Sequence, residues 1–300
     1  MANVRDYRRR IRSVKSTQQI TRAMYLVAAS KMRRAQERIV AARPYARRML
    51  EVLSSLAARA DAAKHPLLAR RPEERVVALV ITADKGFCGA FNANILNRAR
   101  GFLDGLAGRK VQVDIVGKKG RDWFRRRRYA VRRVEVDMFR SLGPGHARDL
   151  ATALVGPFTA GEIDAVHLVY NEFKSVIQQR VVIEPLLPIP LSVLEEAAAA
   201  AQRAETGAAA EGVRPEDYIY EPGDRALFDT LLPRHVETQV YRALLESAAA
   251  EQGARMTAMD NATRNASEMI DSLTLDMNKI RQAAITKELL EVVSGAEAQK

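Results

Sequence analysis

The chain has 300 residues, of which 47% are hydrophobic, 28% charged and 6% aromatic, a composition that indicates a soluble globular protein of one or two domains. No apolar run approaches the roughly 20 residues that a membrane-crossing helix needs, and no apolar segment of a secretory signal follows the first charges. The single cysteine, Cys88, excludes an internal disulfide and a zinc site built from cysteines.

The formal net charge of +12 lies within the first 60 residues, which hold fifteen Lys and Arg against three Asp and Glu. The other 240 residues are neutral overall. An unbalanced basic segment is typical of a surface that contacts nucleic acid or an acidic protein, because a solvated helix face usually balances its charges. We therefore expect a functional acidic partner, and the arginines that represent this basic face are Arg8, Arg9, Arg33 and Arg34.

An apolar heptad runs through the N-terminal segment, which we assign to residues 1–66. Alternating steps of three and four residues over such a length predict a coiled-coil helix. Gln18 and Thr21 are polar positions in this seam, and Pro44 falls on the outer face, where it would bend the helix without filling the seam. The seam positions are 4, 7, 11, 14, 18, 21, 25, 28, 32, 35, 39, 42, 46, 49, 53 and 56.

The pattern changes in residues 70–194, where short runs rich in Val and Ile alternate with helical stretches. This alternation predicts an α/β layer with a mainly parallel sheet. The expected fold is thus an antiparallel coiled coil of long N- and C-terminal helices with an inserted Rossmann-like α/β domain. The predicted strands are 76–84, 111–117, 131–139, 162–170 and 181–189, and the predicted helices lie near 91–107, 118–128 and 146–157.

An alanine-rich bridge at 195–215 leads into the C-terminal segment, residues 216–300. We expect the low-complexity bridge to be mobile. The helix after it is predicted to begin near Arg225 and to carry a second seam, which should pair with the first in the antiparallel sense. Its seam positions are 256, 259, 263, 266, 270, 273, 277, 280 and 284.

The stretch ITADKGFCGAFN at residues 81–92 is the best candidate for an enzymatic site. A strand followed by a glycine-bearing turn and a helix can hold a phosphate, and Lys85 would add charge. Neither GxGxxG nor GxxxxGK[ST] is present, so a tight turn that needs Gly86 and Gly89 for backbone freedom is the favoured interpretation. Cys88 lacks a recognisable base, and we predict no catalytic residue, cofactor or metal site.

The segment ITKELLEVVSGAEA, residues 285–298, has an apolar pattern that the coiled-coil seam does not explain. Leu289, Leu290, Val292 and Val293 cannot share one narrow stripe of a helix. A helix that is apolar on several sides is expected to be enclosed, although it lies here beyond the end of its seam.

The same C-terminal segment resembles the signature of the gamma subunit of F-type ATP synthases. Three further stretches resemble that family in order and spacing: IRSVKSTQQITRAMYLVAASKMRRAQ at 11–36, ITADKGFCGAFN at 81–92, and the stretch from YIYEPGDR to DNAT at 218–263. With one cysteine, the chain lacks the inserted cysteine pair by which some photosynthetic relatives are regulated.

The resemblance implies a non-catalytic central rotor shaft that couples ion flow to ATP synthesis or hydrolysis. Its coiled coil would stand inside a hexamer of alpha and beta subunits, and its α/β foot would rest on the membrane ring of c subunits beside the epsilon subunit. It would be peripheral to the cytoplasmic face of the bacterial inner membrane. The basic face would meet acidic loops of the beta subunits, and the apolar tip at 289–293 would turn in a sleeve of the hexamer. Matching beta-subunit contacts are Met24, Arg281, Gln282, Thr286 and Glu288.

Two other functions remain open from the residues alone. A basic coiled-coil protein that binds nucleic acid would explain the charge of the first 60 residues, but few aromatic residues are present for base stacking. A small phosphate-handling α/β enzyme built around residues 81–92 would explain the glycine-bearing turn. Assembly with alpha and beta subunits would separate the rotor from both.

Overall fold

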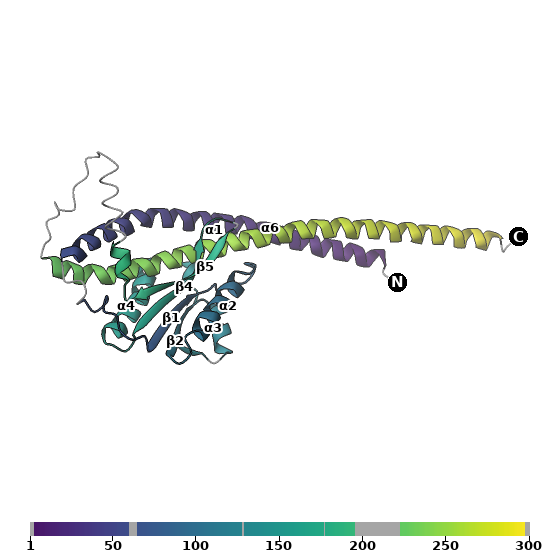
Figure 1. The fold of residues 1–300 in the computed structure, drawn as a ribbon. Helices are drawn as coiled ribbons and strands as arrows, with labels where there is room; N and C mark the ends of the chain where they lie inside the picture. Colours follow the sequence, from purple (N-terminus) through teal and green to yellow (C-terminus); the bar gives the residue numbers. More distant parts are fainter. Residues whose placement is uncertain (1–2, 60–64, 128, 177, 196–222, 298–300) are drawn as a thin grey trace, which may run out of the picture. The chain divides into compact units, whose positions relative to one another are not determined.

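The computed structural model describes residues 3–59, 65–127, 129–176, 178–195 and 223–297 (Figure 1). Its contacts group the chain into two compact units. One unit joins Met1–Ser30 to Arg255–Lys300, and the other comprises Lys31–Ala254. Each contains a part of the long helices α1 (Val4–Arg59) and α6 (Asp224–Glu297). The domain bounds proposed from the sequence stay predictions, and the alanine-rich bridge lies outside the described residues from position 196 onward.

The first unit is a two-helix coiled coil, as the seams predicted. The seam residues of α1 from Val4 to Ala28 and those of α6 from Met256 to Ile280 are buried or half-buried, and the two segments run side by side (Figure 1). The hydroxyls of Thr21 and Thr263 lie 2.8 Å apart and fix the register of the pair.

This register explains the one seam position that the prediction placed wrongly. With Thr21 opposite Thr263 in antiparallel helices of equal rise, Val4 faces Ile280. Because α1 begins at Val4, it offers no residue to cover Ala284, which is exposed. The seam therefore ends one position earlier than expected.

The second unit contains a five-stranded sheet in the order β3-β2-β1-β4-β5. Adjacent strands among the first four are parallel, whereas β5 is antiparallel to β4. The mainly parallel sheet is thus confirmed, with an antiparallel edge strand that the sequence had not indicated. The strands are β1 (Arg75–Ile81), β2 (Lys110–Val116), β3 (Ala130–Glu135), β4 (Ala165–Phe173) and β5 (Gln179–Leu187).

Helices cover both faces of this sheet. α2 (Phe91–Asp104) and α3 (Lys118–Arg125) pack on one face, where Ile95 and Phe124 are completely buried against strand residues. The other face meets α4 (Pro144–Thr159) together with parts of α1 and α6, and their apolar side chains form one continuous core. The two long helices are therefore part of the packing of the α/β layer.

Among the strand boundaries that differ from the prediction, two have a local reason. The strand expected over 131–139 ends at Glu135, and Asp137 then adopts a left-handed φ of 58° that a strand cannot continue through. The strand expected from 162 begins at Ala165. Asp164, just before it, instead accepts hydrogen bonds from the backbone and guanidinium of Arg75.

Within the second unit, α6 is buried on more than one side. Ala243, Leu244 and Leu245 are consecutive, so they point in three different directions, and each is at most 1% exposed. They belong to the core cluster that contains residues of α1 and of the sheet. This part of α6 is apolar around much of its circumference because the same chain surrounds it.

Candidate functional site: an exposed helix tip and a basic helix face

The C-terminal end of α6 carries a large apolar surface that is open to solvent. Every residue from Arg281 to Ser294 is exposed. Exposed apolar side chains this close together are unusual on a protein that has no partner, and they mark an interaction surface. The exposed fractions are 50% for Ile285, 60% for Leu289, 62% for Leu290, 70% for Val292 and 55% for Val293.

The predicted polar contact residues lie on the same segment. Arg281, Gln282, Thr286 and Glu288 are all exposed. The hydroxyl of Thr286 donates to the carbonyl of Gln282 at 3.0 Å, one turn earlier in the helix. Polar and apolar side chains thus alternate around the tip, which can offer hydrogen bonds as well as apolar contact to a partner that surrounds it.

Met24 lies elsewhere, on α1 in the coiled-coil unit. Its side chain is half-buried and falls beside the seam position Tyr25. It therefore contributes to the edge of the coiled coil while remaining partly available to a partner. Its role in such a contact stays a prediction.

The four arginines chosen for the basic face are all exposed on α1. Arg9 lies 3.7 Å from Asp6, and Arg33 lies 3.1 Å from Glu37. Both pairs are largely solvated, so each contributes little to stability. The arginines are consequently free to exchange these local pairs for acidic groups of a partner at small cost.

The turn after β1 is held together by its own polar groups. Thr82 donates its hydroxyl hydrogen to the carbonyl of Val116 at 2.8 Å and accepts from the amide of Gly120 at 2.9 Å. Asp84 Oδ1 accepts the amides of Lys118 and Asp137 at 3.1 and 3.0 Å. These bonds tie the ends of β1, β2 and β3 together, and they favour a structural turn over a phosphate cradle.

Cys88 in this turn is not presented as a nucleophile. Its side chain is 1% exposed, and the amide of Asn92 donates to its sulfur at 3.2 Å. The neighbouring Phe87, in contrast, is 74% exposed and has a left-handed φ of 59°. A bulky residue with positive φ is strained, and here it presents an aromatic ring to solvent.

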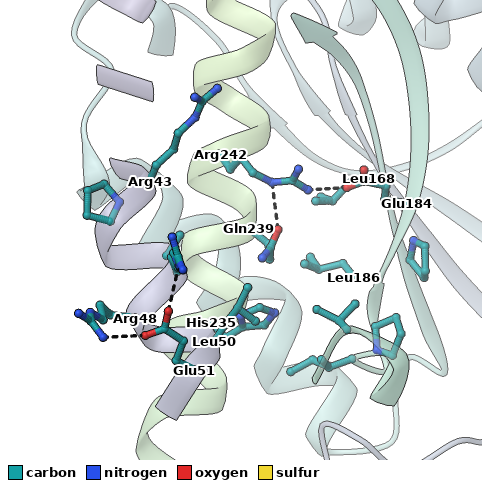
Figure 2. A pocket seen from close by; sticks show the side chains of 17 residues that line it. Arg43, Arg48, Leu50, Glu51, Leu168, Glu184, Leu186, His235, Gln239 and Arg242 are labelled. Atoms are coloured by element: carbon teal, nitrogen blue, oxygen red, sulfur yellow. Dashed lines mark hydrogen bonds and ion pairs between the residues drawn. The ribbon is translucent and has the colours of Figure 1, made fainter. Parts of the chain in front are cut away.

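An open groove of about 1100 Å³ lies within the second unit, between α1, α6 and the β5 edge (Figure 2). Leu50, Leu168 and Leu186 supply apolar lining. Both carboxylates of the lining are engaged in ion pairs: Glu51 with Arg47 and Arg48, and Glu184 with Arg242 at 2.6 Å. The groove therefore does not present a free carboxylate for acid–base chemistry.

Three histidines have a pKa that burial lowers below the ordinary value of 6.5, so they are neutral at pH 7. Burial, helped by the nearby charge of Arg242, lowers the pKa of His235 on the groove wall to about 4. Burial also lowers the pKa values of His65 and His167. In the part of the chain that the structure describes, no cluster of His, Cys, Asp and Glu has the arrangement of a metal site, and no helix is long and apolar enough to cross a bilayer.

One charged surface escaped the sequence analysis. Residues 118–133 contain nine Lys and Arg against one Asp, but acidic residues elsewhere hide this excess when charge is summed over 240 positions. Arg125, Arg126 and Arg127 are exposed at the end of α3. The run RRRR at 125–128 was the signal that a shorter window would have found.

Comparisons with known proteins agree over the full length of the chain. The family model described as ATP synthase matches residues 3–299. An ATP synthase gamma chain from an Anaeromyxobacter species is 49% identical over 305 residues, which cover 100% of both chains. Another, from Heliobacterium modesticaldum, is 48% identical and covers 99% of both.

The chain belongs to the ATP synthase gamma-chain family. Solved structures agree with this assignment. The central stalk of the Tetrahymena thermophila mitochondrial ATP synthase has 28% identity and a TM-score of 0.57, covering 81% of this chain and 99% of that one. A chain of the Euglena gracilis mitochondrial enzyme has 22% identity and a TM-score of 0.66, covering 99% and 94%, and it supports the fold of this gamma-family chain.

Proposed function

We propose that this chain is the central rotor shaft of an F-type ATP synthase, a subunit that catalyses nothing itself. It would turn with ion flow through a membrane ring and thereby drive ATP synthesis on the beta subunits, or run in reverse during ATP hydrolysis. The observation that carries the proposal is the apolar tip of α6, residues 289–293, exposed in a chain that belongs to the gamma-chain family.

The exposed apolar tip explains why this chain would bind a partner that covers the end of α6. Fully burying a side chain such as Leu or Val contributes about 1.5–3 kcal/mol. Leu289, Leu290, Val292 and Val293 are more than half exposed, so a sleeve formed by alpha and beta subunits would gain several kcal/mol from enclosing them. At about 100° per residue, these four side chains cover roughly 160° of the helix circumference, so a partner must cover nearly half of the helix to bury all four.

Polar contacts beside the apolar tip would couple the rotation of this chain to the beta subunits. Arg281, Gln282, Thr286 and Glu288 are exposed next to the apolar tip, and Met24 is half-buried on α1. As an asymmetric shaft turns, it meets the three beta subunits with different side chains and biases them toward different conformations, a coupling of sites by rigid-body rotation. We infer that these five residues take part in it.

The remaining partners follow from the place of a central stalk. We expect the α/β part to rest on the c-subunit ring beside the epsilon subunit, at the cytoplasmic face of the bacterial inner membrane. The chain would be peripheral and would touch the bilayer through the ring. A non-catalytic role is supported by the buried Cys88 and by the engaged carboxylates of the groove.

Reconstitution with purified alpha and beta subunits tests the proposal. Gel filtration should yield one stoichiometric complex that contains this chain and hydrolyses ATP, whereas the chain alone should not hydrolyse it. A chain that stays separate from alpha and beta but binds single-stranded nucleic acid would support the nucleic-acid alternative. Saturable, low-micromolar nucleotide binding by the chain alone would support the phosphate-handling enzyme.

The basic face provides a second test. Reversing Arg8, Arg9, Arg33 and Arg34 together should weaken assembly or alter ATPase regulation more at low than at high ionic strength, because salt screens exposed charges. The free energy of unfolding of the free chain should change by under about 1 kcal/mol, since the pairs of these arginines are solvated. A defect that is the same at all salt concentrations would contradict an electrostatic role.

A further inference from the structure

The end of α3 presents a compact basic surface for which the proposed rotor function gives no role. Arg125, Arg126 and Arg127 are exposed in consecutive positions. Within the residues that the structure describes, no ion pair joins any of the three to an acidic side chain, and the nearby Asp122 is paired with Arg121 at 2.8 Å. We call Arg125, Arg126 and Arg127 the α3 arginine cluster.

Aromatic rings support one member of this cluster. The guanidinium of Arg127 lies 4.0 Å from the centre of the Trp123 ring, and the Trp123 and Tyr129 rings are stacked with centres 6.1 Å apart. Phe124 meets Trp123 and Tyr129 edge-on and is completely buried. A guanidinium held over an indole loses less freedom on binding, and the N–H groups of Arg127 that do not donate to the Trp123 carbonyl remain available to an anion.

The cluster lies on the side of the sheet that the long helices leave open. α3 packs on the face shared with α2, whereas α1, α4 and α6 cover the opposite face (Figure 1). Next to α3 is the edge strand β3, where Val131 and Val134 are each 37% exposed. The surface thus combines exposed cations, a half-buried Trp and a partly apolar margin.

This combination matches the boundary of a lipid bilayer. Arginine forks fit phosphate groups, and Trp and Tyr rings favour the level of the headgroups, where one end of a ring is apolar and the other is wet. Basic clusters beside a membrane are attracted to anionic lipids. We propose that the α3 arginine cluster, with Trp123, binds the headgroups of anionic phospholipids.

The choice of a lipid surface over other polyanions rests on the proposed function, which puts the α/β part of the chain beside a membrane ring. A nucleic acid would be expected to stack its bases on several exposed rings, but Trp123 is the chain's only tryptophan and is half-buried under Arg127. The contact would be weak and screened by salt, which suits a surface that must move over the bilayer.

The single tryptophan makes the proposal testable at one site. The full chain is mixed at low salt with vesicles of phosphatidylcholine alone or with added phosphatidylglycerol, and both sets carry a nitroxide quencher on a fraction of the headgroups. Trp123 fluorescence should be quenched only with phosphatidylglycerol vesicles, and quenching should fall as salt is raised. Arg125→Gln/Arg126→Gln/Arg127→Gln should weaken vesicle binding about 100-fold, at roughly fivefold per basic residue.

A matched variant, Arg10→Gln/Arg12→Gln/Lys15→Gln, removes the same charge from exposed positions of α1 outside the four arginines of the basic face, and it should retain Trp123 quenching. A milder variant, Arg125→Gln/Arg126→Gln, keeps the Arg127–Trp123 stack and should lose part of the binding without a change in circular dichroism. Equal losses in the two triple variants, or no quenching at low salt, would overturn the proposal, as would binding to poly-glutamate or single-stranded DNA but not to vesicles. These measurements involve no alpha or beta subunit, so their failure is distinct from a failure of assembly.

Discussion

Two stretches of α6 have similar sequences but opposite surroundings. Leu244 and its neighbours are apolar on several sides of the helix and are buried by α1 and the sheet. Leu289 and Leu290 are likewise apolar on adjacent sides, yet they are 60% and 62% exposed. Both stretches contain Leu-Leu-Glu, at 244–246 and 289–291, so the difference in exposure of these leucines lies in what surrounds the helix.

The comparison shows what can be predicted from a helix segment that is apolar over a wide arc. Such a segment is stabilised when another surface covers that arc, because each exposed Leu or Val forgoes about 1.5–3 kcal/mol of burial. The pattern does not say whether the same chain or another one supplies the enclosure. In the middle of α6 the enclosure is part of folding, whereas at the tip we propose that it is part of assembly.

The largest expected effect comes from the same substitution made in each stretch. Leu244→Ala should lower the free energy of unfolding of the free chain by about 2–5 kcal/mol, because it leaves a cavity in a packed core. Leu289→Ala should lower it by less than about 0.5 kcal/mol. Urea titration of both variants provides the measurement, and equal losses would remove the distinction between the two stretches.

Acid should destabilise the buried stretch of α6 and leave the tip unaffected. Burial lowers the pKa of His235 from 6.5 to about 4. The unfolded chain therefore takes up a proton below pH 6.5 while the folded chain resists it until about pH 4, so stability is lost as pH falls through this window. At pH 5 the loss from this group is about 2 kcal/mol.

His235→Gln should reduce the difference in unfolding free energy between pH 7.5 and pH 5 by about that amount. His65 and His167 have pKa values lowered in the same direction, so part of the slope should remain. Urea titrations of the variant and the original chain at both pH values measure the difference. An unchanged pH dependence would show that His235 is protonated in the folded protein or is not buried.

A smaller effect is expected at the polar layer of the coiled coil. Thr21→Val or Thr263→Val alone should cost about 1 kcal/mol, because each leaves the partner hydroxyl in a partly buried seam with one contact fewer. The double variant should regain most of this loss, since two apolar groups replace two bonded ones. Additive losses in thermal melts would mean that the 2.8 Å contact contributes no coupling.

Periodic patterns gave most of the fold in advance. Both seams agree with the buried and half-buried positions of α1 and α6 up to Ile280, and the alternation of strands and helices gave the α/β layer. The antiparallel β5 was not predicted, because its residues have the same apolar character in either direction. The end of the seam depended on where α1 begins, which a pattern on α6 alone cannot show.

The candidate site was harder to predict from periodic sequence patterns than the fold was. The exposure of Leu289 follows from the absence of a partner within the described chain, which no residue type encodes. The α3 arginine cluster was missed because its charge was averaged with that of distant acidic residues. The roles of Met24 and Arg281 rest on family resemblance, since a half-buried Met and an exposed Arg fit many functions.

The central claim is that the apolar tip of α6 is enclosed by assembly. Leu289, Leu290, Val292 and Val293 are changed together to Ser, and the free chain and its complex with alpha and beta subunits are both measured. The melting temperature of the free chain should barely change, while the fraction assembled at limiting concentration, or the coupling of ATP hydrolysis to ion pumping, should fall sharply. A variant that unfolds as a free chain but assembles into a fully coupled complex would contradict this account.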